Sequence, residues 1–141
     1  MRRRIVLLDT SFIIAIAHAG DPHHERAKLL DAELLSDKTL CVLHWGILVE
    51  IADGFARVDR RAKGYTLLER LEMEDRYQIS PIADDLLYEA LAMYRARTDK
   101  EWGLTDCISF VLMKNEGISE ALTADIHFRQ AGFTAILLEA P

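Results

Sequence analysis

The chain has few of the residues that mark secreted or membrane-bound proteins. It holds only two cysteines, Cys41 and Cys107, and both stand in apolar stretches. Two such cysteines make neither a disulfide framework nor a metal-spaced cluster. No apolar run reaches the roughly 20 residues that cross a bilayer, so we expect no membrane segment. The opening MRRRIVLL resembles a signal peptide only until Asp9 interrupts it, and we expect a cytoplasmic protein.

Linker composition is also missing. The 141 residues include three prolines and seven glycines, and they form no Pro/Gly/Ser-rich stretch, repeat or low-complexity segment. A chain of this length can bury a core as one unit. We therefore expect a single domain over residues 1–141.

An excess of positive charge is lacking too, since the formal net charge is −6. Proteins that simply coat nucleic acid are usually basic, so this balance argues against that class. Four of the acids, however, belong to the candidate site described below, and two divalent cations would offset them. The acidity therefore does not exclude a phosphate-bearing substrate that is bound through metal.

What the sequence does contain is an alternation of short apolar runs and amphipathic stretches. Helical spacing of apolar residues recurs between the runs, and residues 21–36 are also expected to be helical, with Pro22 in the first turn. Such alternation predicts a parallel sheet covered on both faces, a three-layer α/β/α sandwich. The five expected strands are Ile5 to Leu8, Thr39 to Leu43, Tyr77 to Ser80, Ala121 to Ala124 and Ala135 to Leu138.

Four carboxylates stand where this fold would bring them together. Asp9 ends the run IVLLD and Asp125 ends EALTAD, while Glu50 and Asp106 lie on helical stretches. Ligands of open α/β sheets bind beyond the carboxyl ends of the strands. If the two strands are neighbours, all four side chains can reach one rim. Hard oxygen ligands in such a cluster favour Mg²⁺ or Mn²⁺.

Each acid taken alone also has an ordinary interpretation. Asp9 and Asp125 are good helix N-caps, and Asp106 suits a first turn that follows Thr105 as N-cap. Glu50, which borders an apolar stripe, would then be a surface carboxylate in a salt bridge. The ligand hypothesis instead assigns supporting hydrogen bonds to hydroxyls near Asp9 and Asp106, and those residues are Thr10, Ser11, Thr105 and Ser109.

At these motifs the chain resembles the PIN-domain nucleases, and among them the VapC-like toxins. The segment LLDTSFIIA is similar to the first acidic motif of that family, and Glu50 matches its helical glutamate. DKEWGLTDCISFVLM, from Asp99 to Met113, resembles the third motif, and ALTADIHFRQAGF, from Ala121 to Phe133, the fourth. The resemblance covers essentially the whole chain in the same order.

This resemblance implies a five-stranded parallel sheet and cleavage of RNA with Mg²⁺ or Mn²⁺. It implies that the metal-binding and catalytic acids are Asp9, Glu50, Asp106 and Asp125. Supporting hydroxyls carry over to Ser11 or Thr10 and to Thr105. It further implies the toxin of a type II toxin–antitoxin pair and a homodimer. The apolar helices expected near the rim could bind an antitoxin peptide as a helix in a groove, with a basic side chain in the acidic site.

The residue types suit phosphodiester hydrolysis. A carboxylate-held cation lowers the pKa of bound water, shields the phosphate and stabilises the leaving oxygen, and the products would carry 5′-phosphate and 3′-hydroxyl ends. A basic run could contact the RNA backbone, although a solvated connection between helices is an equally good interpretation. That run consists of Arg57, Arg60, Arg61 and Lys63.

Two other functions fit less well. A phosphatase with Asp9 as nucleophile usually has a second aspartate two residues later, and position 11 is serine. A PIN-like module that binds RNA or protein without cleaving would not require four intact acids.

Overall fold

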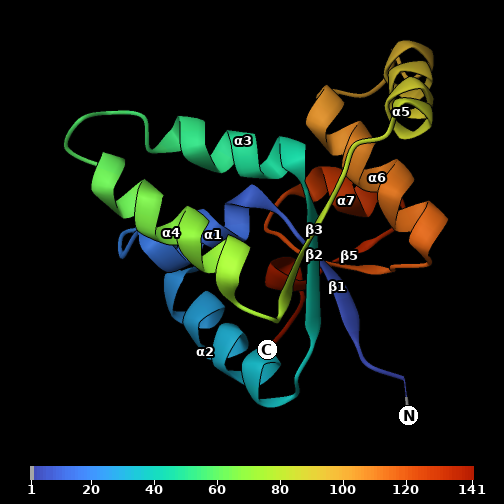
Figure 1. Cartoon of the computed structure of the whole chain (residues 1–141). Helices are drawn as coiled ribbons and strands as arrows, with labels where there is room; N and C mark the ends of the chain where they lie inside the picture. Colours follow the sequence, from blue (N-terminus) through green and yellow to red (C-terminus); the bar gives the residue numbers. More distant parts are fainter. Residues whose placement is uncertain (1) are drawn as a thin grey trace.

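The computed structural model describes residues 2–141 and contains five strands with helices on both sides (Figure 1). All neighbouring strand pairs are parallel, in the order β3-β2-β1-β4-β5. The predicted five-stranded parallel sheet is therefore confirmed. The strands are β1 (Ile5–Leu8), β2 (Leu40–His44), β3 (Tyr77–Ser80), β4 (Glu120–Leu122) and β5 (Thr134–Ala135).

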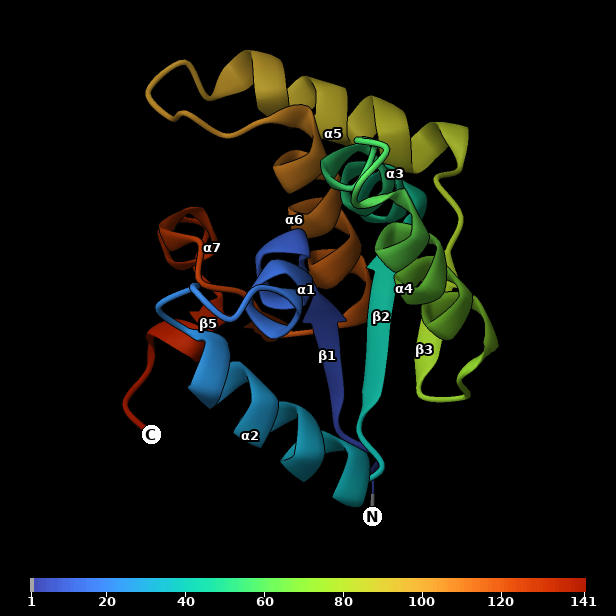
Figure 2. The same cartoon turned by 90° about the vertical axis from the view of Figure 1, so that its left-hand side faces the viewer.

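The helices form the outer layers of the sandwich. Helices α1 (Thr10–Ala17), α2 (His24–Ser36) and α4 (Arg61–Met73) cover one face (Figure 2). Helix α6 (Leu104–Glu116) covers the other, and α5 (Asp84–Ala96) packs on α6. Helix α3 (Trp45–Gly54) follows the carboxyl end of β2, and the short α7 (Ile126–Gln130) follows β4.

Burial explains why the central elements are so apolar. Strand β1 has three consecutive residues that are fully buried, Val6, Leu7 and Leu8, as expected for a strand with helices on both faces. Helix α6 is buried along seven consecutive residues, from Cys107 to Met113. It is therefore a core helix and not an amphipathic surface helix.

An aromatic cluster fixes α7 to α6. The ring of Phe110 on α6 lies edge-on to Trp102 at 5.0 Å and to Phe128 of α7 at 4.9 Å between centroids. Trp102 also donates its indole N–H to Gln130 Oε1 at 3.0 Å. Trp102 thus packs in the core. The cluster holds the start of α7, and with it Asp125, in place.

Several element boundaries differ from the sequence predictions. The expected fifth strand over residues 135–138 is wrong beyond Ala135, because Leu137 N–H donates to Thr123 O and the chain turns into a 3₁₀ helix at Ile136–Leu138. Helix α2 begins at His24, and Pro22 lies in the preceding turn and not in the first helical turn. There Asp21 Oδ1 accepts the His23 N–H at 2.8 Å, which stabilises a turn instead of a helix start.

Within residues 2–141, no helix has both the length and the hydrophobicity required to cross a bilayer.

Removing the Phe128 ring should destabilise the protein strongly. Phe128 is completely buried, so Phe128→Ala should lower the free energy of unfolding by about 3–5 kcal/mol. Tyr65→Ala, at a tyrosine of α4 that is 71% exposed, should change it by less than about 1 kcal/mol. Urea unfolding followed by circular dichroism measures both. Equal losses in the two variants would contradict the packing described here.

Candidate active site

Two of the predicted acids meet because β1 and β4 are neighbours. The strands pair in parallel, with Leu7 opposite Ala121 and Leu8 opposite Leu122. Directly after them, Asp9 N–H donates to Leu122 O at 3.2 Å. Asp9 and Asp125 therefore leave the sheet at one rim, as the strand positions predict.

Two hydroxyls orient the Asp9 carboxylate. Ser11 Oγ donates to Asp9 Oδ2 at 2.9 Å, and Thr123 Oγ1 donates to the same oxygen at 2.7 Å. Asp9 occupies the N-cap position of α1, yet its side chain makes no capping hydrogen bond. The carboxylate is thus held toward the rim and does not serve the helix, which favours the ligand hypothesis over the cap.

Burial and neighbouring negative charge raise the pKa of Asp9. The residue is only 7% exposed, and removal from water is the largest cause of a pKa of about 6. Hydrogen bonds from Thr123 and Ser11 oppose the shift, while the charges of Asp106 and Glu50 add to it. The predicted acids on α3 and α6 therefore lie close enough to act on Asp9 electrostatically.

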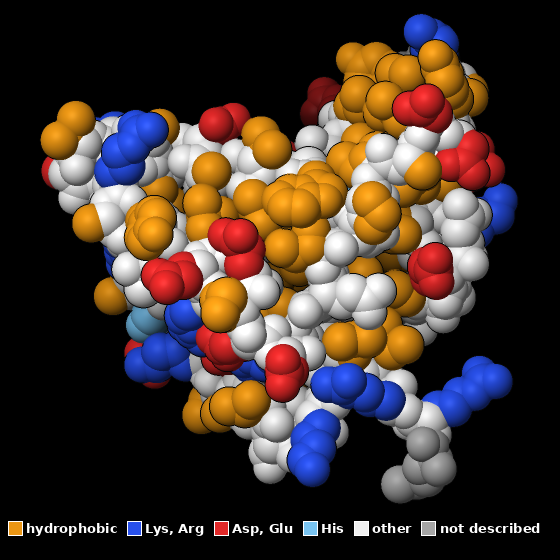
Figure 3. Space-filling model, in the orientation of Figure 1, with side chains coloured by type: hydrophobic (Ala, Val, Ile, Leu, Met, Phe, Trp, Pro, Cys, Tyr) orange, Lys and Arg blue, Asp and Glu red, His pale blue; other side chains and the backbone are white. Residues whose placement is uncertain are grey.

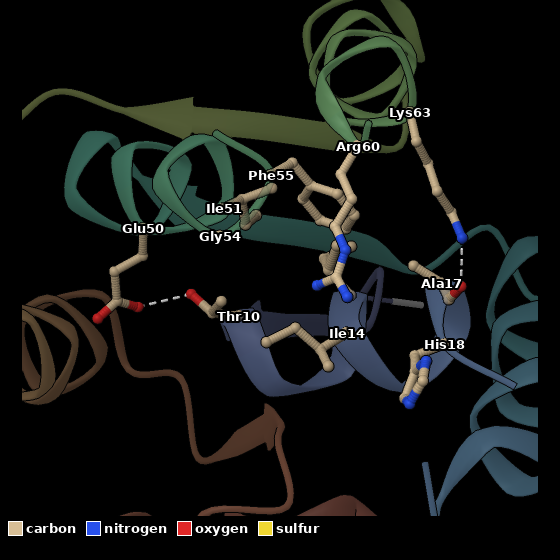
Figure 4. A pocket seen from close by; sticks show the side chains of 11 residues that line it. Thr10, Ile14, Ala17, His18, Glu50, Ile51, Gly54, Phe55, Arg60 and Lys63 are labelled. Carbon is tan, nitrogen blue, oxygen red and sulfur yellow. Dashed lines mark hydrogen bonds between the residues drawn. The ribbon is translucent and has the colours of Figure 1, made fainter. Parts of the chain in front are cut away.

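Glu50 reaches the same rim from α3. It is exposed, and Thr10 Oγ1 donates to Glu50 Oε1 at 2.6 Å, so this bond ties α1 to α3 (Figure 4). Of the two hydroxyls expected near Asp9, Ser11 binds Asp9 and Thr10 binds Glu50. Thr10 begins α1 and its hydroxyl faces α3, whereas Ser11, the next helical position, faces β4.

Asp106 and Asp125 form the other side of the cluster. Asp106 Oδ2 accepts the Gly103 N–H at 3.2 Å at the start of α6. Burial first, and then the charge of Asp125, raises the pKa of Asp106. Asp125 is the N-cap of α7 and accepts the His127 N–H at 2.9 Å, so its predicted capping role is confirmed.

The hydroxyls expected around Asp106 are not its partners. Gly103, not Thr105, is the N-cap of α6, and no hydrogen bond of the described residues joins Thr105 Oγ1 to Asp106. Ser109 Oγ instead lies 2.9 Å from Nε2 of the buried His44. Burial lowers the pKa of His44 to about 4, so the ring is neutral and needs a partner inside the core. That need explains why Ser109 points away from the rim.

The sequence interpretation missed His127. Its Nδ1 lies 3.2 Å from Asp125 Oδ1 and 3.5 Å from Asp106 Oδ2. Within residues 2–141, these three are the one group of acids, cysteines and histidines whose ligand atoms all lie within 4.8 Å of one another. The available signal was the spacing Asp125-Ile126-His127, which places an imidazole in the first turn after a candidate ligand.

The donor set suits a divalent cation. Among the described residues, none of the four acids forms a salt bridge with lysine or arginine. The nearest titratable nitrogen, His127 Nδ1, is buried without a hydrogen-bond partner. Clustered oxygens beside an unpartnered nitrogen are what a metal ion would satisfy.

A groove opens beside Glu50 (Figure 4). It is a cavity of about 340 Å³ between α1, α3 and the start of α4, with Thr10 and Glu50 at one end. Its walls are mainly apolar, and they include Ile13, Ile14, Ala17, Ile51 and Phe55.

The predicted basic run is divided by this groove. Arg60 and Lys63 line it, and the Arg60 side chain extends across it toward α1 (Figure 4). Arg57 instead pairs with Asp59 at 3.3 Å, and Arg61 donates to Ala56 O. Only half of the run therefore lines the groove.

Residues 6–134 match the model of the PIN domain. The chain belongs to the PIN domain family. It is 26% identical over 136 residues to the 23S rRNA-specific endonuclease VapC20 of Mycobacterium tuberculosis, an alignment that covers 94% of this chain and 98% of that protein.

Solved structures share the PIN fold along nearly the whole chain. The crystal structure of VapC20, described as a sarcin-ricin loop cleaving toxin, superposes with a TM-score of 0.80 at 23% identity and covers 93% of this chain and 98% of that one. FitAcB from Neisseria gonorrhoeae gives a TM-score of 0.64 at 24% identity, covering 92% and 94%. VapBC2 from Rickettsia felis, bound to a promoter DNA fragment, gives 0.67 at 14%, covering 92% and 96%.

Neutralising Asp9 should stabilise the metal-free protein at neutral pH. Folding raises the pKa of Asp9 from 3.8 to about 6. Protonated Asp9 therefore contributes fully to the free energy of unfolding below pH 3.8, and this contribution is lost as the pH rises through 6. Two pKa units correspond to about 3 kcal/mol. Asp9→Asn should therefore be more stable than wild type by up to about 3 kcal/mol at pH 7.5, and nearly equal at pH 4.

Urea unfolding in the presence of EDTA at both pH values tests this. The exposed Asp53→Asn serves as a control and should show no such pH-dependent difference. An Asp9→Asn variant less stable than wild type at pH 7.5 would refute the electrostatic description of the site.

Proposed function

We propose that this PIN-domain protein is a metal-dependent endoribonuclease and the toxin of a type II toxin–antitoxin pair. The main support is the cluster at the rim, where buried or half-buried acids lie near one another without a lysine or arginine partner among the described residues. The relative named as a 23S rRNA-specific endonuclease, which aligns over 98% of its length, supports the choice of RNA.

Asp9, Asp106 and Asp125 would hold the cation, with Glu50 at the open side. When bound, Mg²⁺ or Mn²⁺ would lower the pKa of a coordinated water and neutralise charge on the phosphate. The protein itself contributes orientation, because Ser11 and Thr123 fix one Asp9 oxygen and Gly103 N–H fixes one Asp106 oxygen. Thr10 does the same for Glu50. The expected products carry 5′-phosphate and 3′-hydroxyl ends.

We assign contacts with the RNA backbone to the side of the site where Arg60 and Lys63 stand. Both line the groove that ends at Glu50. Lys63 donates to Ala17 O, whereas no hydrogen bond or salt bridge of the described residues occupies the Arg60 side chain. Arg60 is therefore the better candidate for a phosphate contact. Ribosomal RNA as substrate would place the activity in the cytoplasm.

We assign the antitoxin to the groove between α1, α3 and α4. Its apolar walls suit the apolar face of a helix, and the acidic end at Glu50 suits a basic side chain. The solved FitAB and VapBC2 structures that share the fold support a protein partner. A partner bound in the groove would place its basic side chain beside the carboxylates, where that side chain would compete with the metal ion.

We also propose a two-fold homodimer. Figure 3 shows hydrophobic side chains gathered over α5, which packs on the rest of the molecule mainly through α6. Tyr88 and Tyr94 of α5 are 69% and 52% exposed, and Trp45 of α3 is 46% exposed. A self-complementary apolar surface of this kind suits a second copy of the chain.

Removing one metal ligand should abolish RNA cleavage. With Mn²⁺ and a mixed RNA pool, Asp106→Asn should cleave at least about a hundredfold more slowly than wild type, because a charged ligand is lost. Asp99→Asn is the matched control, since Asp99 is exposed and pairs with Arg97 and Lys100 outside the cluster. If wild type does not cleave, or if the two variants cleave alike, the nuclease assignment is wrong and an RNA-binding module is the better description.

A charge in the groove should weaken antitoxin binding. Ile14 lines the groove, and Ile14→Glu would place an unpaired carboxylate against the partner's apolar face. We expect the antitoxin, obtained by co-expression, to bind Ile14→Glu at least about tenfold more weakly than wild type, as measured by calorimetry. Val58→Glu, at a residue 94% exposed and outside the groove, should bind like wild type. Equal affinity of Ile14→Glu and wild type would exclude this groove.

A further inference from the structure

We propose that His127 is a ligand of the same metal ion, through Nδ1, and that this nitrogen makes the site prefer manganese-type ions to magnesium. The inference rests on the proposed metal site but goes beyond its four acids. It concerns one side chain whose ring lies between the carboxylates of α6 and α7.

The distances fit shared coordination. His127 Nδ1 lies 3.2 Å from Asp125 Oδ1 and 3.5 Å from Asp106 Oδ2. Adjacent ligands of an octahedral ion with bonds of about 2.1 Å stand about 3 Å apart. The two nitrogen–oxygen distances are thus close to the spacing of adjacent ligands, and the three residues offer ligand atoms within 4.8 Å of one another.

The backbone that carries the ring is held by a hydrogen bond, yet the ring nitrogen Nδ1 has no hydrogen-bond partner among the described residues. Asp125 Oδ1 accepts the backbone N–H of His127, so α7 begins with the imidazole turned toward Asp106. Nδ1 is buried and makes no hydrogen bond to any described residue, although two carboxylates are close. A simple ion pair would align an N–H with one of those oxygens. If Nδ1 instead directs its lone pair at a cation between the two carboxylates, no N–H has to be aligned with either oxygen.

A nitrogen ligand alters the choice of metal. Mg²⁺ prefers oxygen donors and retains its waters, whereas Mn²⁺ and later first-row ions accept imidazole more readily. A set of carboxylates plus one imidazole should therefore bind Mn²⁺ more tightly than Mg²⁺. The same acids without His127 should discriminate less between Mn²⁺ and Mg²⁺.

Electron paramagnetic resonance of Mn²⁺ bound to the protein tests the assignment directly. Electron spin echo modulation should show coupling to a nitrogen in wild type, and ¹⁵N-histidine labelling should change its frequency. The coupling should disappear in His127→Gln and persist in His18→Gln, whose histidine is exposed and lines the groove. Calorimetry should show Mn²⁺ binding at least about tenfold weaker in His127→Gln, with a smaller loss for Mg²⁺.

A second variant keeps the test independent of folding defects. His127→Asp supplies an oxygen donor instead of nitrogen, so it should retain Mg²⁺ binding while the preference for Mn²⁺ falls. Wild type that binds Mn²⁺ without nitrogen coupling, and with unchanged affinity in His127→Gln, would overturn the role of His127 alone. The proposed function would still stand if Asp106→Asn loses Mn²⁺. Wild type that binds no Mn²⁺ at all would overturn both.

Discussion

Repulsion among carboxylates at one rim of the sheet is the constraint on which the rest of this structure depends. Asp9 is almost completely buried, and its pKa of about 6 records both the loss of water and the nearby charges of Asp106 and Glu50. A fold does not gather such groups for its own stability, because each ionised carboxylate placed there costs free energy. The hydrogen bonds that orient these carboxylates do not remove the repulsion between them. A bound cation would remove it.

The architecture holds the acids together through rigid elements. Asp9 and Asp125 follow neighbouring strands whose pairing is fixed by the buried residues of β1 and β4. Asp106 stands at the start of α6, a helix buried over two turns, and the Phe110 aromatic cluster anchors α7. Only Glu50 is exposed, and Thr10 holds it. The open side of the site is therefore the side of the groove, where substrate or an inhibiting partner can enter.

Much of this arrangement could be predicted from the sequence. Continuous apolar runs such as IVLL identify strands buried on both faces, and acids directly after them must lie at the carboxyl rim. The edge strand was less predictable, because the apolar residues Ile136–Leu138 are buried in a 3₁₀ helix and do not pair in the sheet. Apolar character indicates burial but does not say which backbone conformation achieves it.

Side-chain partners were the hardest to predict, because they depend on a rotation of about 100° between successive helical positions. Thr10 and Ser11 are adjacent, yet one binds Glu50 and the other Asp9. Ser109 was assigned to Asp106, but the buried and neutral His44 takes its hydroxyl. His127 was overlooked because a single histidine in a first helical turn has no spacing pattern of its own. Its importance arises only from α6 and α7 meeting in space.

The most direct test of the shared cation site is anomalous diffraction from crystals of the protein grown with Mn²⁺. We expect one or more anomalous peaks at the rim, with oxygens of Asp9, Asp106 and Asp125 within about 2.5 Å of manganese. Crystals that take up Mn²⁺ only elsewhere, or that show no peak between these carboxylates at millimolar Mn²⁺, would contradict it.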